Sequence, residues 1–208
     1  MNSDHAVLLA IDTSLGSLAA VAADRGVVER RSADPLAHAE VIGDLVSEAL
    51  AAAGLDRGDI THVVMGTGPG PFTGLRIGMA AARGFAIGAA VPLLPVISHE
   101  GVAYAELFDK PLGTKIRVIQ DARRKELFVS SWQLTDSGVT MTAQPAVVPR
   151  KGFAASDHDH WHEAVSGAGL IAVAKTRLAT GGAFASADPL YLRDPDVRQP
   201  VPLKPNHP

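Results

Sequence analysis

The chain has 208 residues, no cysteine and a formal net charge of -3 at pH 7. This length is enough for one large domain or two small lobes with an apolar core. The lack of cysteine excludes a disulfide framework, a thiolate metal site and a cysteine nucleophile, and the net negative charge excludes a global field that would attract RNA.

The composition and the first residues indicate a cytoplasmic protein without a membrane contact. The first five residues are mostly polar, and the apolar run at 6–11 is too short for a signal sequence or a membrane span. Apolar residues make up 47% of the chain but aromatic residues only 5%. We therefore expect a core built by close backbone approach more than by large rings.

The first half of the chain predicts a mixed α/β sheet. The segments AVLLAID, SLAAVAAD and VVERRSA are joined by short polar turns, which is typical of a three-stranded β-meander. Apolar residues at helical spacing then run from 37 to 53 and stop at Gly54. A strand at THVVMG, a Gly/Pro loop, a helix over 75–90 and a strand at PLLPVIS follow.

The second half repeats the opening pattern. RVIQDARRKELFVSSW aligns with LLAIDTSLGSLAAVAA when Asp121 is laid on Asp12, because each has an apolar run, one Asp, a short turn and a second apolar run. This predicts two lobes of common ancestry, over residues 1–100 and 101–193. Residues 194–208 form a Pro-rich tail that we expect to be poorly ordered.

The turn Asp12-Thr13-Ser14 is a weak candidate for binding a nucleotide. Short polar side chains and free backbone N–H groups between two strands can hold a phosphate, and Asp12 could position a metal-bound water. The alternative is that Asp12 and Ser14 only satisfy the turn itself. The loop at 66–74 is a rigid connector and not a phosphate site, because Pro69 and Pro71 lack N–H donors and no Gly-Lys-Ser/Thr follows.

The two helices of the first half have more small and apolar faces than one sheet can bury. Small residues four positions apart allow a second helix to approach closely, so a helical protein interface is a serious hypothesis beside the alternative that both helices cover their own sheet. The positions that carry this hypothesis are Val41, Leu45, Ala49, Gly74, Leu75, Gly78, Met79 and Ala82.

Two polar clusters remain. The run from Asp157 to Glu163 holds three alternate histidines, but it lacks a regular element to fix ligand geometry, so we predict no metal site. The basic turn Arg123-Arg124-Lys125 is most simply a solvated hairpin tip, and it is also the best candidate for touching RNA within a complex.

LLAIDTSLGSLAAVA, GTGPGPFTGLRIGMAAARGFAIG and the late PLYLR together resemble the TsaB (YeaZ) family of the actin-like ATPase superfamily. The resemblance is dense over the first hundred residues and thin in the second lobe. It implies a two-lobed actin-like, ribonuclease H-like fold with duplicated mixed sheets and a reduced second lobe. It also implies a partnership with the catalytic paralogue TsaD and the ATPase TsaE in modifying the adenosine beside the anticodon of tRNA.

The same stretch is similar to TsaD, in which a His-His-Met-Glu-Gly-His segment holds the catalytic metal. Laying residues 96–102 on that segment places Ser98 and Val102 at the ligand positions and His99 out of register. Valine cannot bind a metal. The resemblance therefore implies a subunit with no catalytic residue, metal or cofactor of its own, with ATP or ADP at most at an interface shared in the complex, and a homodimer when the partner is absent. The alternative is an independent phosphotransferase or a peptidase.

Overall fold

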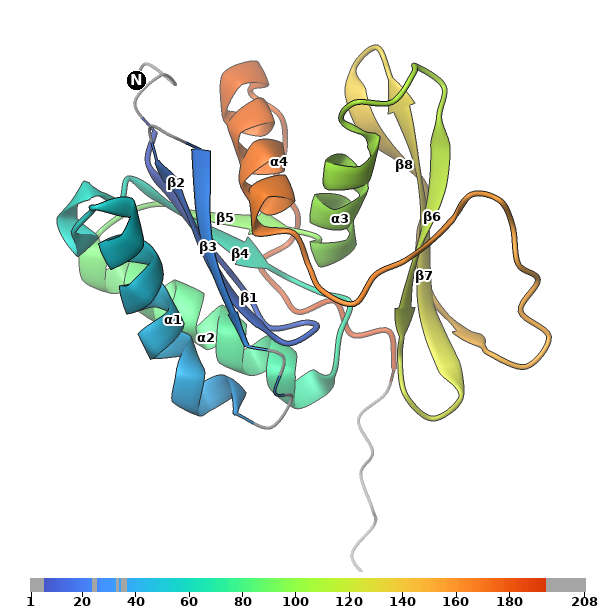
Figure 1. Cartoon of the computed structure of the whole chain (residues 1–208), viewed down its shortest axis with the longest axis horizontal. Helices are drawn as coiled ribbons and strands as arrows, with labels where there is room; N and C mark the ends of the chain where they lie inside the picture. The colour runs from blue at the N-terminus through green and yellow to red at the C-terminus, as the bar shows by residue number, and fades with distance from the viewer. Residues whose placement is uncertain (1–5, 24–25, 33, 35–36, 194–208) are drawn as a thin grey trace, which may run out of the picture.

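The computed structural model describes residues 6–23, 26–32, 34 and 37–193, so the predicted Pro-rich tail at 194–208 lies outside the described residues. Two β-sheets lie side by side, with two helices between them and two more on the outer face of the first sheet (Figure 1). Among the described helices, none is long and apolar enough to cross a membrane.

The first sheet has five strands in the order β3-β2-β1-β4-β5. The first three strands pair antiparallel, which confirms the predicted meander, whereas β4 and β5 add on parallel to β1. The strands are β1 (Leu8–Asp12), β2 (Ser17–Ala23), β3 (Gly26–Ser32), β4 (His62–Gly66) and β5 (Leu93–Val96).

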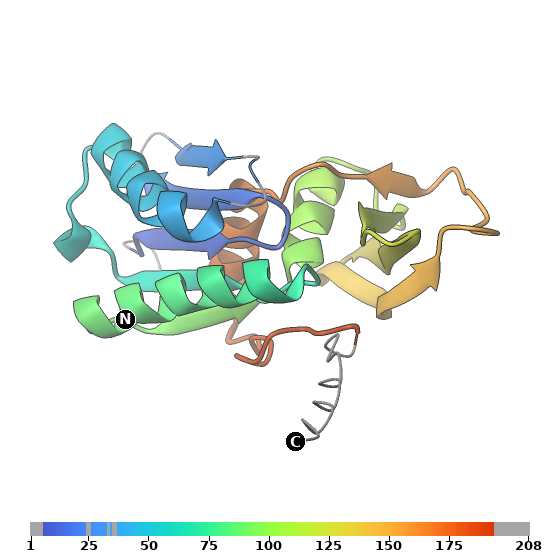
Figure 2. The same ribbon diagram turned by 90° about the horizontal axis from the view of Figure 1, so that it is seen from below.

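The central strand β1 is apolar on both faces because both faces are covered. Leu9 and Ile11 belong to the core under α1 (His38–Ala53) and α2 (Phe72–Ala89). Leu8 and Ala10 belong to the core under α4 (Gly167–Thr180) on the opposite face. Continuous apolar runs are typical of strands buried on two sides. Figure 2 shows the α1 and α2 layer from below.

The second sheet repeats the topology of the first. Its order is β8-β7-β6-β9, which matches β3-β2-β1-β4 strand for strand. Asp12 pairs with Leu18 and Asp121 with Leu127, so the two hairpins have the same register about the same residue type. This agreement supports the predicted duplication. The strands are β6 (Lys115–Asp121), β7 (Glu126–Thr135), β8 (Gly138–Pro149) and β9 (Asp159–Trp161).

The two halves meet where α3 (Ser98–Leu107) packs on α4. A Cβ on Gly169 would overlap the carbonyl of Gly101, so the two backbones touch at a point that only glycine allows. On its other side α3 packs on the second sheet, where Val102 and Leu107 meet Trp132. The single helix α3 thus connects the two cores.

A buried polar chain crosses the same junction. The ring of His99 contacts Ser130 Oγ at 2.8 Å and Gln120 Oε1 at 3.2 Å, and the Gln120 amide donates to Ser14 O at 3.0 Å. His162 packs edge-on against His99, with ring centroids 5.1 Å apart, and its two ring nitrogens have no hydrogen-bond partner. Burial lowers the pKa of His99 to about 3 and that of His162 to about 4.

Most of the residues predicted to contact a partner are buried within this protein. Their small size therefore does not indicate a partner interface, which corrects the prediction. Gly74 and Gly78 face the Asp12–Ser17 turn: a Cβ on Gly78 would overlap the Thr13 hydroxyl. Leu45, Ala49, Leu75, Met79 and Ala82 are buried in the core, and Val41 is half-buried against it. Small residues on the inner face therefore reflect close packing of α2 on its own hairpin.

We predict that Gly78→Ala and Gly84→Ala have opposite effects on stability. Gly84 is exposed with open space around it, so alanine there raises the free energy of unfolding by about 0.5–1 kcal/mol through helix propensity. Alanine at position 78 must displace Thr13, so it should lower the free energy of unfolding by about 1–3 kcal/mol. Urea denaturation followed by circular dichroism measures both. A Gly78→Ala protein as stable as Gly84→Ala would contradict the packing described above.

We also predict that His162 makes the fold sensitive to acid. Its pKa is about 4 in the folded chain against an ordinary value of 6.5, so below pH 6.5 the unfolded chain binds more protons and the free energy of unfolding falls. His162→Phe should reduce that fall between pH 6.5 and 4 by roughly 1 kcal/mol per pH unit. The control is His158→Phe at an exposed position. Equal slopes for wild type and His162→Phe would show that His162 is not held neutral.

Candidate functional site

The carboxylate of Asp12, the first residue of the predicted nucleotide turn, lies at the end of β1. Its Oδ1 accepts hydrogen bonds from Ser14 N at 2.8 Å and Ser14 Oγ at 2.6 Å, and its Oδ2 accepts one from Ser98 Oγ at 2.5 Å. Only 1% of the residue is exposed. Burial raises the pKa of Asp12, and the bonds from Ser14 and Ser98 act in the opposite direction.

The rest of the predicted nucleotide turn is also used internally. Thr13 Oγ1 donates to Gly74 O at 2.6 Å and accepts from Gly78 N at 2.9 Å, and Gly70 packs directly on Ser14. All three residues of the turn are buried. Asp12 and Ser14 thus satisfy the turn, which is the alternative given in the sequence analysis, and Thr13 also holds the start of α2. The turn offers no open surface to a phosphate.

Ser98, which aligns with the first metal ligand of TsaD, is also used in hydrogen bonds within the chain. Ser98 Oγ accepts from Gly68 N at 2.9 Å while it donates to Asp12, and Ser98 N donates to Gly68 O at 2.7 Å. Val102 lies in the apolar core under the second sheet. Within the described part of the chain, no three His, Cys, Asp or Glu side chains come together as metal ligands.

The histidines of the run from 157 to 163 do not converge. His160 Nδ1 lies 3.4 Å from Glu106 Oε2, whereas His162 points inward to His99. Asp159 accepts a hydrogen bond from Arg117 at 2.6 Å. Desolvation is the largest single influence on the pKa of Asp159 and raises it. The hydrogen bonds from Arg117 and Ser156 together outweigh desolvation and keep that pKa below its ordinary value.

An open cleft of about 440 Å³ lies at the mouth between the two lobes. Its wall is formed by the loop at 70–72, the hairpin tip at 122–124, Phe128 and the segment at 191–193. Arg123, Arg124 and Arg193 make it basic. The structure thus brings two residues of the predicted basic turn next to the glycine loop, although these segments are 50 residues apart.

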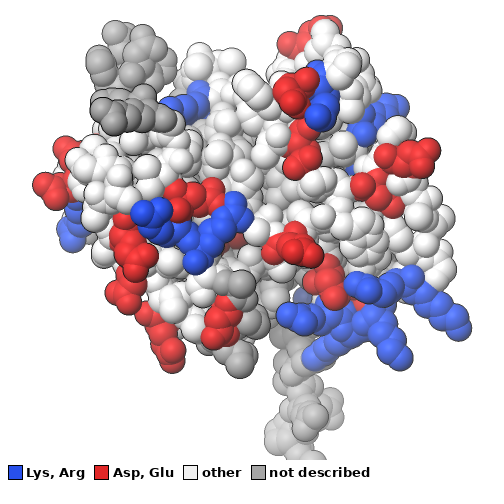
Figure 3. Space-filling view, viewed as in Figure 1, with Lys and Arg blue, Asp and Glu red and all other residues white. Residues whose placement is uncertain are grey.

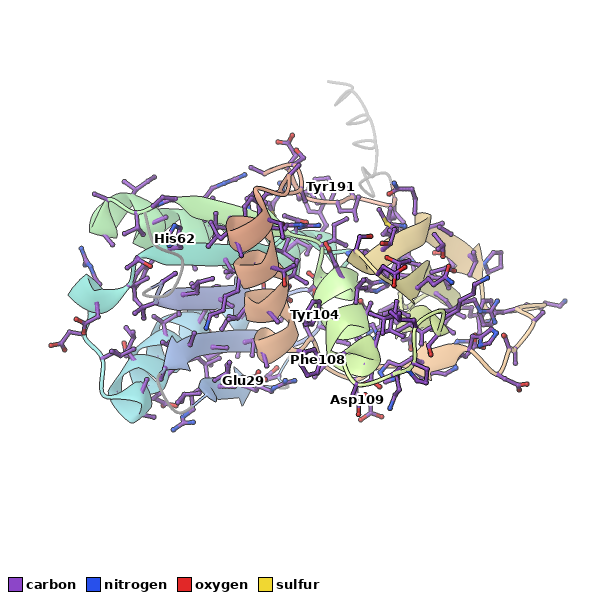
Figure 4. The ribbon with its side chains drawn as sticks, turned by 90° about the horizontal axis from the view of Figure 1, so that it is seen from above. Glu29, His62, Tyr104, Phe108, Asp109 and Tyr191 are labelled. Atoms are coloured by element: carbon purple, nitrogen blue, oxygen red, sulfur yellow. The ribbon has the colours of Figure 1, made fainter. Side chains whose placement is uncertain are left out.

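A stack of rings forms one side of this cleft, and sequence reasoning missed it. Phe72 and Tyr191 stack with centroids 4.7 Å apart, and the Arg76 guanidinium lies 3.7 Å from the centre of the Phe72 ring. Arg76 also donates to the Tyr191 hydroxyl at 2.5 Å. Figure 4 shows Tyr191 on the segment that follows α4. Both rings belong to the motifs that carry the family resemblance, which was the available signal.

The outer face of α2 is exposed and weakly polar. Ala80, Gly84 and Ile87 lie at its centre, and Ile87 is 80% exposed. Arg83 donates to Ala187 O at the edge of this face. The exposed small residues of α1 include Gly43 and Ala51. The two helices thus have an exposed surface of small and apolar residues, but its residues differ from those predicted.

The comparisons with known proteins agree with this architecture. Residues 18–154 match the family model described as TsaD: tRNA N6-adenosine threonylcarbamoyltransferase. A Mycobacterium tuberculosis protein described as uncharacterized is 34% identical over 212 residues, covering 92% of this chain and 93% of that protein.

A named relative and a solved structure also match this chain. The tRNA threonylcarbamoyladenosine biosynthesis protein TsaB of Escherichia coli is 31% identical over 133 residues, which are 64% of this chain and 57% of that protein. A crystal structure from Pseudomonas aeruginosa, described as similar to the peptidase YeaZ, superposes with a TM-score of 0.77 at 22% identity over 90% of this chain and all of the other. This chain therefore belongs to the TsaD family, and its named relatives identify it as a member of the TsaB (YeaZ) type.

Proposed function

We propose that this chain takes part in tRNA threonylcarbamoyladenosine biosynthesis as the non-catalytic scaffold subunit. In this role it works with the catalytic subunit TsaD and the ATPase TsaE, which together transfer threonylcarbamoyl to N6 of the adenosine beside the anticodon, position 37, in tRNAs that read ANN codons. The coarse assignment rests on the family match and on the named TsaB relatives.

The single observation that carries the non-catalytic role is the closed state of the Asp12 turn. A carboxylate that positions a metal-bound water must face the substrate. The Asp12 carboxylate instead accepts hydrogen bonds from Ser14 and Ser98 and is almost fully buried. The chain has kept the fold of an actin-like protein and closed the position where phosphate chemistry would occur.

The peptidase alternative finds little support in the two contacts between a serine hydroxyl and a histidine ring among the described residues. Ser17 Oγ lies 2.7 Å from His38 Nδ1, and Ser130 Oγ lies 2.8 Å from His99 Nδ1. Each of these serines and histidines is buried, with at most 6% of its surface exposed. A nucleophile must reach its substrate. Both pairs therefore fit a role in packing better than a role in hydrolysis.

Partner binding is assigned to the outer faces of α1 and α2. The exposed small residues Gly43, Ala80 and Gly84 allow close helix approach, and the strongly exposed Ile87 would be buried by it. TsaD is the proposed partner, and a second copy of the chain takes its place when TsaD is absent. Any ATP or ADP would be held at an interface shared with the complex, and Arg123, Arg124 and Lys125 are the proposed tRNA contacts.

Reconstitution with TsaD, TsaE, tRNA and the threonylcarbamoyl-adenylate synthase tests the role. Activity should require this chain and should largely survive Asp12→Asn, because the amide oxygen can still accept from Ser14 and the amide nitrogen can donate to Ser98 Oγ. Asp12→Ala is the poorer test, since it leaves buried donors unpaired at a cost of about 1–3 kcal/mol. Full activity without the chain would refute the scaffold role, and inactivity of a folded Asp12→Asn protein would indicate chemistry at the turn.

The interface assignment predicts that Gly84→Phe blocks association and leaves the fold intact. Gly84 has open space around it, so the ring extends outward and prevents a second helix from approaching. Sedimentation at micromolar concentration should show a monomer, and the variant should not copurify with TsaD. Lys175→Phe on the exposed side of α4 is the control. Normal association of Gly84→Phe would place the interface elsewhere.

A further inference from the structure

The tip of the β6–β7 hairpin holds three consecutive cations in an unusual backbone conformation. Arg123, Arg124 and Lys125 have φ values of 63°, 54° and 61°. These values lie in the left-handed region, which is unfavourable for every residue except glycine. Asp121 Oδ1 accepts from Arg123 N at 2.8 Å, and Lys125 O accepts from Arg150 N at 2.8 Å. The surrounding bonds hold the tip in this conformation, and all three cations are exposed.

Further cations extend this tip. Arg150 and Lys151 follow β8 directly and are exposed, and Arg150 lies 3.3 Å from Asp121 in a half-exposed ion pair. Figure 3 shows Lys and Arg side chains gathered at this end of the second lobe. The chain as a whole is acidic, with a net charge of -3, so this concentration is local. A patch of this kind attracts a polyanion without making the whole protein bind one.

An exposed tryptophan adjoins the cations. Trp161 is 51% exposed, whereas the other tryptophan of the chain, Trp132, is 1% exposed and donates to Ser130 Oγ in the core. Arg150 lies 5.8 Å from the centre of the Trp161 ring, and Phe153 meets that ring edge-on at 6.3 Å. A tryptophan that only anchored the 150–158 loop could be buried as Trp132 is. This one leaves half its surface open beside a row of cations.

We propose that the hairpin tip, Arg150, Lys151 and Trp161 form one RNA-binding surface that holds phosphates with its cations and stacks an unpaired base on Trp161. Cations beside an exposed aromatic ring are the combination by which proteins hold single-stranded nucleic acid. Phosphate contacts alone would not need the ring, whereas an unpaired base can stack on it. The choice of RNA as the polyanion rests on the proposed function, and the stacking role of Trp161 extends it.

The test measures binding of two labelled RNA probes to the full chain, alone and with TsaD, by fluorescence anisotropy at two salt concentrations. One probe is a hairpin with an unpaired loop, and the other is a blunt duplex with the same number of nucleotides. Trp161→Ala should weaken binding of the hairpin about tenfold and leave the duplex unchanged, and Trp161→Phe should restore most of the affinity. Lys125→Glu with Lys151→Glu should weaken both probes and flatten the salt dependence.

Matched controls carry the same changes elsewhere. Phe108→Ala removes a ring that is 73% exposed at the C-cap of α3, and Lys175→Glu reverses an exposed charge on α4. If Trp161→Ala behaves as Phe108→Ala does, or if it weakens hairpin and duplex equally, the stacking role is wrong. If wild type binds neither probe in either form, the surface is not an RNA site. Neither outcome changes whether reconstituted activity requires this chain, so the inference can fail while the scaffold role stands.

Discussion

The organisation of the first lobe depends on one buried carboxylate. Asp12 ends β1, and its two oxygens are satisfied by Ser14 in the following turn and by Ser98 at the start of α3. Gly66 at the end of β4 must be glycine because a Cβ there would overlap the Asp12 oxygen. An unpaired charge in this place would be costly, so strand, turn and helix are fixed relative to one another by the need to satisfy it.

The same constraint agrees with the proposed scaffold role, because a carboxylate satisfied inside the chain is not available to a substrate. Two hairpins of equal register, ending in Asp12 and Asp121, have taken different roles. The first is closed under α2 and supports the core, whereas Asp121 is exposed and orders a basic tip. The two hairpins can differ at their tips because each is stabilised by pairing within its own sheet. The residues of a tip can therefore change without loss of the hairpin.

Sequence patterns predicted the first lobe better than the second, for physical reasons. Strands buried on two faces and a helix ending at Gly54 in the left-handed conformation leave strong local signals. The helix at 98–107 was missed because nearly all its faces are buried, so no amphipathic pattern marks it. The strand at 138–149 has a single buried residue, so no alternating apolar pattern marks it in the sequence. The inward direction of Gly74 and Gly78 depends on Thr13, a contact 60 residues distant that no local pattern reveals.

The segment that follows α4 has a consequence for how such proteins diversify. Residues 185–191 return across the first lobe, where Ala185 N bonds Pro95 O, Leu190 N bonds Thr67 O, and Arg76 and Arg83 hold Tyr191 and Ala187 from α2. These contacts are mainly polar and lie outside the apolar cores. Substitutions at 185–188, before the PLYLR motif, can therefore accumulate with little effect on folding while they reshape the border of an exposed helix. Lineages could exchange one binding partner for another by drift in a few residues near the chain end, with the ancestral architecture unchanged.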